Sequence, residues 1–189
     1  LWPHRFSTSG FFAARLTRTA EIDLPLEPAP TRPLRATGQA PLNSQQLQEI
    51  LDWLQETYGF DLHSLLNTYH LELWRSTASV FAVPVTFLQH FADLPCQMLG
   101  LKVLEITPEG WQPAHEWVSR FAPHFHAGRL TLPAELLDQW LKGDDVPMPS
   151  VINEPARLWI VFDEHNRFIG RGRQSGNWLK NLLPRRLTS

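Results

Sequence analysis

The sequence predicts an α+β protein, in which a small α/β subdomain is followed by a mixed β domain with short helices. The chain has 189 residues, of which 43% are hydrophobic and 11% aromatic, so it can bury a substantial core. One helical pattern stands out over residues 44–58, and short apolar runs typical of strands follow it. We therefore predict four segments: a terminal hairpin over 1–22, a proline-rich linker over 23–42, an α+β subdomain over 43–106 and a second domain over 107–189.

The hairpin is predicted from Phe11, Phe12 and Leu16, which follow a cluster of Ser, Thr and Gly over 7–10 that is typical of a turn. A lone hairpin is not stable in water, so we expect it to pack on the rest of this chain or on a further domain. Since the chain begins with Leu1 rather than Met, we expect it to be a fragment or a processed product of a longer protein. In the linker, five prolines within residues 25–41 disfavour both helices and strand ladders.

The α+β subdomain begins with the clearest helix, over 44–58, which Asn43 or Ser44 can cap and Gly59 can end. Its other elements are a hairpin over 69–75 and 80–83, a short helix that begins at Pro84, and a strand over 99–106 that ends in a turn over 107–110. The second domain is predicted to contain a short helix around Trp117 and Phe121, a strand over 129–132, a helix that begins at Pro133 and ends before Gly143, a hairpin over 158–162 and 168–173, and a last short segment over 177–183.

Charge is distributed unevenly along the chain. The net charge is only −2, but residues 167–189 contain six basic and no acidic side chains, while residues 1–20 form a second acid-free stretch with three arginines. Clustered basic residues favour phosphate binding, because neutralised phosphates release counterions. The alternative is an ordinary solvated surface.

Among the eight tryptophans, Trp53, Trp74, Trp117 and Trp140 fit apolar core patterns, whereas Trp178 lies within the basic tail and could stack on a base.

Enzyme motifs are not found in the sequence: it has no phosphate-binding Walker loop, nucleophile elbow or HExxH helix. Gly170, Gly172 and Gly176 form GxGxxxG, one residue longer than the dinucleotide fingerprint, and we interpret them as turn and close-approach glycines that could admit a phosphate backbone.

His124 and His126 would share one face of an extended segment, but two ligands are too few for a metal site. The single Cys excludes an internal disulfide, and no secretory signal opens the chain, so we expect a cytoplasmic protein.

Two stretches of the chain resemble a known family. Leu-Trp-Pro-His at 1–4 and Gly-Phe-Phe-Ala-Ala-Arg-Leu at 10–16 resemble the closing hairpin of the Rossmann domain in Nol/Nop/Sun RNA cytosine-5 methyltransferases. Phe-Ile-Gly-Arg-Gly-Arg at 168–173, Leu-Lys-Asn at 179–181 and Pro-Arg at 184–185 resemble the end of the bacterial ribosomal-RNA (rRNA) branch, where a PUA-like RNA-binding domain follows the catalytic domain. This second resemblance covers most of residues 42–189.

The resemblance implies that residues 107–189 form a PUA-like mixed β-barrel, and that the chain is a C-terminal region that positions rRNA. The catalytic cysteines and the S-adenosylmethionine site of the family would then lie in a catalytic domain outside this chain, and we expect no catalytic, cofactor-binding or metal-binding residue here. Asp-Leu-Pro-Cys at 93–96 has the residue types of the family's Asp-x-Pro-Cys motif but not its position. In the family that motif precedes the closing hairpin, whereas Cys96 follows the predicted hairpin over 1–22. We interpret Cys96 as a small buried apolar residue.

The predicted RNA contacts come mostly from the basic tail. The phosphate contacts are Arg167, Arg171, Arg173, Lys180, Arg185 and Arg186, with Arg15 and Arg18 as an extension toward the catalytic domain and Trp178 as a stacking residue. The expected partners are rRNA and the protein's own N-terminal catalytic domain, and we expect a monomer that does not contact membranes.

Two other functions stay open from the sequence. The chain could be a protein-interaction module whose exposed aromatic residues bind a partner and whose basic tail meets an acidic surface. It could also be a small enzyme that uses His115, Glu116, His124 or His126, which would require a pocket that brings these side chains together.

Overall fold

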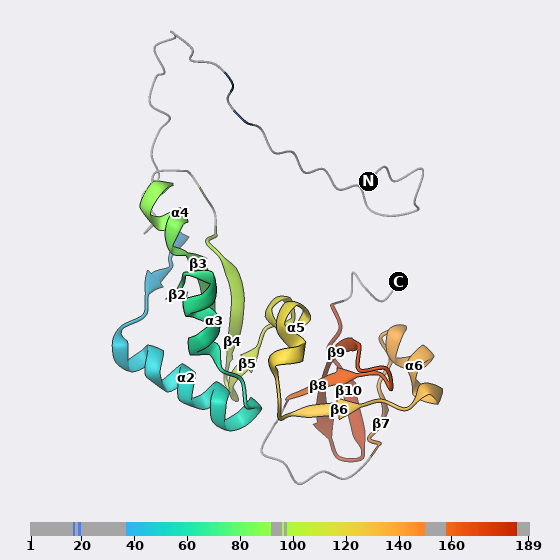
Figure 1. Ribbon diagram of the computed structural model, residues 1–189. Helices are drawn as coiled ribbons and strands as arrows, with labels where there is room; N and C mark the ends of the chain where they lie inside the picture. The colour runs from blue at the N-terminus through green and yellow to red at the C-terminus, as the bar shows by residue number, and fades with distance from the viewer. Residues whose placement is uncertain are drawn as a thin grey trace. The chain divides into compact units, whose positions relative to one another are not determined.

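The structure is a computed structural model that describes Thr17, Thr19 and residues 37–91, 96, 98–149 and 158–184 (Figure 1). From residue 37 onward the described residues belong to one compact unit. The hairpin predicted over 1–22 and residues 23–36 of the linker fall outside the described residues, apart from Thr17 and Thr19. None of the helices described is long and apolar enough to cross a membrane.

Helix α2, Ser44–Tyr58, confirms the clearest helix of the sequence. The side chain of Asn43 accepts a hydrogen bond from the Gln46 N–H at 2.8 Å, and the side chain of Gln46 accepts one from the Asn43 N–H at 3.2 Å. This capping box satisfies two backbone donors at the start of the helix. Gly59 ends the helix with φ of 57°, a left-handed conformation that glycine adopts without a steric penalty.

Helix α3, Leu62–Tyr69, was not among the predicted elements. The Asp61 carboxylate caps it by accepting a hydrogen bond from the Ser64 N–H at 2.9 Å, and Leu62, Leu65 and Leu66 are buried. With eight residues it makes only about two turns, which gives too few apolar repeats for its period to be recognised beside α2.

The first sheet is entirely antiparallel. Its strands pair in the order of the chain and are β1 Ala40–Pro41, β2 Leu71–Arg75, β3 Ser79–Pro84, β4 Leu101–Thr107 and β5 Gly110–Pro113. The predicted hairpin and the strand over 99–106 are therefore confirmed, and a short helix, α4 Val85–His90, follows Pro84 as expected. Two strands of this sheet were not expected: β1 falls in the predicted linker, and β5 extends the sheet beyond residue 106.

The second sheet is mixed. Its order is β6 Arg129–Thr131, β8 Leu158–Phe162, β9 Phe168–Ser175, β10 Trp178–Asn181 and β7 Val146–Pro147, with β6 and β8 parallel and the other pairs antiparallel. The helices in this half are α5 His115–Phe121, the short 3₁₀ helix η2 Ala122–His124 and α6 Ala134–Leu141. The last short segment predicted from the sequence is thus strand β10. The α+β class is confirmed, and the finer PUA-like assignment stays a prediction.

Strand β8 is buried on both faces, and its residues alternate between two hydrophobic clusters. Ile160 and Phe162 join the cluster built on α2, α3, the first sheet and α5. Trp159 and Val161 join a second cluster with α6 and β10. The segments predicted over 43–106 and 107–189 therefore share a core through β8, and their boundary stays a prediction.

Candidate nucleic-acid interface

Arg171 lies inside the protein, although the sequence predicted it as a phosphate contact. Its side chain in β9 leaves the residue only 7% exposed, and its Nη1 donates a hydrogen bond of 2.6 Å to the carbonyl of Pro113. The Glu105 carboxylate lies 3.8 Å from the same nitrogen. Burial lowers the pKa of Arg171, and the negative charge of Glu105 opposes this shift. The guanidinium therefore joins the second sheet to β4 and β5 of the first.

Three other predicted RNA contacts share one face of the second sheet. Arg173 in β9 and Lys180 in β10 are directly paired across the antiparallel ladder, so their side chains lie on the same face. Trp178 lies two residues before Lys180 and therefore shares this face. Trp178 is 49% exposed, and the Lys180 side chain is 51% exposed. We refer to Arg173, Trp178 and Lys180 as the β9–β10 patch.

Lys180 is held in place by an acidic neighbour. Its Nζ lies 2.6 Å from Oδ2 of Asp145, and the N–H of Asn181 donates to Oδ1 of the same carboxylate at 2.9 Å. The hydrogen bond from Lys180, followed by that from Asn181, lowers the pKa of Asp145. The pair orients the ammonium group, and it also offsets part of the positive charge of the patch.

Arg167 is exposed but lies away from the patch. It belongs to the turn between β8 and β9, where its backbone N–H and its Nε donate to the Asp163 carboxylate at 2.8 and 2.6 Å. These bonds, the backbone bond first, lower the pKa of Asp163, and the Arg167 side chain remains 69% exposed. Arg173 lies six positions after Arg167 along the extended chain, which corresponds to about 20 Å. The remaining predicted contacts, Arg15, Arg18, Arg185 and Arg186, lie outside the described residues.

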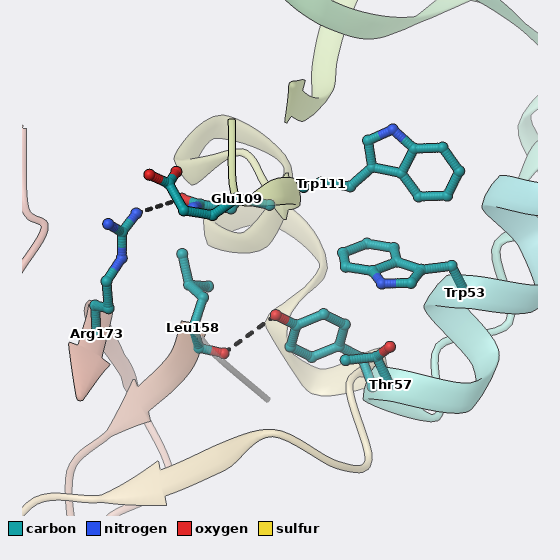
Figure 2. Close-up of a pocket in the computed structure, with 9 residues that line it drawn as sticks. Trp53, Thr57, Glu109, Trp111, Leu158 and Arg173 are labelled. Atoms are coloured by element: carbon teal, nitrogen blue, oxygen red, sulfur yellow. Dashed lines mark hydrogen bonds between the residues drawn. The ribbon is translucent and has the colours of Figure 1, made fainter. Parts of the chain in front are cut away.

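A pocket of about 290 Å³ lies beside the patch and includes Arg173 (Figure 2). It is lined by Trp53, Thr57, Tyr58, Glu109, Gly110, Trp111, Gln112, Leu158 and Arg173, which come from α2, the β4–β5 turn, β5, β8 and β9. The sequence pattern predicts Trp53 as a core residue and gives no role to Trp111. Both are partly buried and pack against the first hydrophobic cluster.

Hydrogen bonds order the polar side of this pocket. Arg173 Nη2 donates to Oε1 of Gln112 at 3.1 Å, and the Tyr58 hydroxyl donates to the carbonyl of Leu158 at 3.1 Å (Figure 2). Burial raises the pKa of the Tyr58 hydroxyl, and the positive charge of Arg171 acts against this shift. Tyr58 therefore stays protonated as a hydrogen-bond donor, and the guanidinium of Arg173 is the cationic group of the pocket.

His115 does not share a pocket with His124 and His126 among the described residues. His115 is buried, and its ring lies 5.7 Å from that of Phe168. His124 and His126 are exposed and line a separate hollow with Asp61. In the part of the chain that the structure describes, no three His, Cys, Asp or Glu side chains form a group that could hold a metal ion.

The glycines of β9 approach the protein itself rather than a ligand. A Cβ on Gly172 would lie 2.7 Å from Cδ1 of Leu179 and 3.1 Å from the Trp140 ring, and a Cβ on Gly170 would lie 3.0 Å from Cδ2 of Leu183. The close-approach interpretation is confirmed, but these side chains fill the space that a phosphate would need. The glycines of β9 therefore do not fit S-adenosylmethionine or a dinucleotide.

Comparison with known proteins gives similarity along nearly the whole chain. No family model matches the sequence. Proteins named ribosomal RNA small subunit methyltransferase F are 27% identical over 187 residues in Cronobacter sakazakii and in Citrobacter koseri, and 26% identical over 195 residues in Shewanella putrefaciens. The resemblance to rRNA methyltransferases is thereby confirmed. In each case the alignment covers 99% of this chain but only 37% of the relative, as a C-terminal region would.

Proposed function

We propose that this chain is the RNA-binding C-terminal region of an S-adenosylmethionine-dependent rRNA cytosine-5 methyltransferase, and that it positions rRNA for a catalytic domain outside the chain. The β9–β10 patch is the observation that carries this proposal. It presents two basic side chains and an exposed tryptophan on one face of a sheet, in a chain similar to rRNA methyltransferases over 99% of its length.

The chemistry of the patch suits RNA. Arg173 and Lys180 can each neutralise a phosphate, and the indole of Trp178 offers a flat apolar face on which an unpaired base can stack. Arg167 adds a further cation in the turn just before β9, outside the patch. Arg171 has a different role in this proposal, because its guanidinium is buried and bonded to Pro113.

In this proposal, a catalytic domain outside this chain carries out the methyl transfer. The proposal assigns S-adenosylmethionine and the attacking cysteine to the part of the relatives that this chain does not span, and it gives this chain the tasks of binding and orienting the substrate. The implied partners are rRNA and the protein's own N-terminal catalytic domain. This chain alone would bind RNA without methylating it.

A salt series tests the proposal. We expect the full chain to bind rRNA hairpins more tightly than heparin, with an affinity that falls as salt rises. Arg173→Gln combined with Lys180→Gln should reduce the slope of log affinity against log salt by about 1.4, since each phosphate contact on single-stranded RNA contributes roughly 0.7. A matched control is Arg75→Gln combined with Lys142→Gln, which removes the same charge from exposed positions on other elements. If both double variants had the same slope as the unaltered chain, the patch would not be the RNA contact.

The alternative is a protein-interaction module. An apolar groove of about 730 Å³ favours it, because Tyr69, Leu71, Trp117 and Phe121 are among its lining residues and Tyr69 is exposed. Saturable binding to a protein partner, together with equal and weak binding to rRNA hairpins and heparin, would support this function instead.

A further inference from the structure

We infer that the pocket beside the β9–β10 patch receives one unpaired nucleobase of the bound RNA. This inference rests on the proposed function and deepens it, because it assigns a base-binding subsite to residues that the sequence analysis did not connect with RNA. The subsite is formed by Trp53 and Thr57 of α2, Glu109 and Trp111 around the start of β5, and Arg173 of β9 (Figure 2).

The apolar wall of the pocket consists of aromatic rings held edge to face. The ring centroids of Trp53 and Trp111 are 5.6 Å apart with an interplanar angle of 80°, and those of Trp53 and Tyr58 are 5.5 Å apart at 74°. Such pairs are favourable because the positive edge of one ring meets the negative face of another. Both tryptophans also pack against the first hydrophobic cluster, so their orientations are fixed before a ligand arrives. A preformed indole surface binds a base at a low cost in side-chain entropy.

The polar side of the pocket can bind the edge of a base. The guanidinium of Arg173 carries five N–H donors, of which one bonds to Gln112, and the carboxylate of Glu109 supplies acceptor oxygens beside it (Figure 2). Thr57 adds a hydroxyl group that can donate or accept. Donors and acceptors next to an aromatic wall match a nucleobase, which combines a π-face with carbonyl and amino groups on its edge.

The volume of the pocket and its position beside the patch favour an unpaired nucleotide as the ligand. A volume of about 290 Å³ is at the lower end of small-molecule sites, so the pocket can hold one base but not a helical stem. Arg173 belongs both to the pocket and to the patch, so a base in the pocket would be attached to a backbone that runs past Lys180 and Trp178. Single-stranded loops and bulges are the parts of RNA whose bases can turn outward in this way.

The test compares two RNA hairpins that differ only at a one-nucleotide bulge, which carries a base in one and an abasic site in the other. The unaltered full chain should bind the hairpin with the base at least about fivefold more tightly, since stacking of one base on an aromatic side chain has an effect of this order. Trp111→Leu should remove this preference and keep the affinity for the abasic hairpin. Tyr69→Ser, which alters an exposed aromatic residue outside the pocket, should keep the preference.

The outcomes separate this inference from the proposed function. Equal, salt-dependent binding of both hairpins would overturn the nucleobase subsite and leave RNA binding intact. No binding to either hairpin would overturn both proposals. A titration with the four nucleoside monophosphates distinguishes the source of the base, because tighter binding of a free mononucleotide than of the bulged hairpin would make the pocket a nucleotide site rather than an RNA subsite. The hairpin comparison uses the unaltered chain, so it does not depend on how the variants fold.

Discussion

Replacing Arg171 with Met should destabilise the protein and leave the proposed RNA contacts in place. The substitution keeps an unbranched apolar stem but removes the bond from Nη1 to the Pro113 carbonyl, which is 2.6 Å long and buried. Loss of a hydrogen bond from a charged donor costs about 1.5–3 kcal/mol when the acceptor stays buried. The Glu105 carboxylate also loses a cation at 3.8 Å, but its side chain is 32% exposed, so solvent screening limits this loss to less than about 1 kcal/mol. We therefore expect the free energy of unfolding to fall by about 1.5–4 kcal/mol.

The assay is urea unfolding of the full chain at neutral pH, followed by tryptophan fluorescence. The matched control is Arg167→Met, since Arg167 is an arginine of the same tail whose side chain is 69% exposed and bonded to Asp163. This control should lower the free energy of unfolding by less than about 1 kcal/mol, as expected for an exposed ion pair. The reasoning would be refuted if Arg171→Met changed stability no more than the control did and instead reduced the salt slope of RNA binding.

Two further substitutions test the packing of β9 and the pairing of Lys180. Gly172→Ala should lower the free energy of unfolding by about 1–3 kcal/mol, because the new methyl group would meet Leu179 and Trp140 at 2.7–3.1 Å, and an unchanged melting temperature would contradict this. Asp145→Asn should weaken the dependence of stability on pH in acid. The pKa of Asp145 is lowered in the folded protein, so its stabilising effect is present above the unfolded value of about 3.9 and is lost as pH falls through the folded value. The same variant should bind RNA more tightly at neutral pH, because it removes the anion beside Lys180, and weaker binding would show that Asp145 orients Lys180 more than it neutralises it.

The elements that the sequence predicts well are those whose signals are local. Helix α2 has a capping side chain, four turns of apolar spacing and a terminal glycine within residues 43–59, so each signal indicates the same structure. Helix α3 and strand β5 were missed because they are short, with eight and four residues. Strand β5 has four residues and is defined by its pairing with β4 across the turn predicted over 107–110.

At the candidate site, too, features that depend on neighbouring residues could be predicted from the sequence, and features that depend on tertiary contacts could not. The cluster of basic residues after position 166 was visible in the sequence. The sequence did not show that Arg171 is buried while Arg173 lines the pocket. The two arginines are two residues apart on one strand and face the same side of the sheet. Arg171 is buried because Pro113, 58 residues away in the sequence, presents a carbonyl to it, and such a pairing depends on tertiary structure alone.

The positions of these two arginines explain why an RNA-binding surface would lie at this place in the fold. Arg171 fixes β9 against β5 through Pro113, and Arg173 reaches Gln112, the residue before that proline. Strands β5 and β9 therefore form both the contact between the two sheets and one edge of the pocket. A base bound between Trp111 and Arg173 would contact both sheets at once, so its orientation would be set by the rigidity of the joint rather than by a flexible loop. If this region positions a substrate for a catalytic centre outside the chain, as proposed, such rigidity is the property that matters, because a displacement of about 1 Å can cost roughly 100-fold in rate.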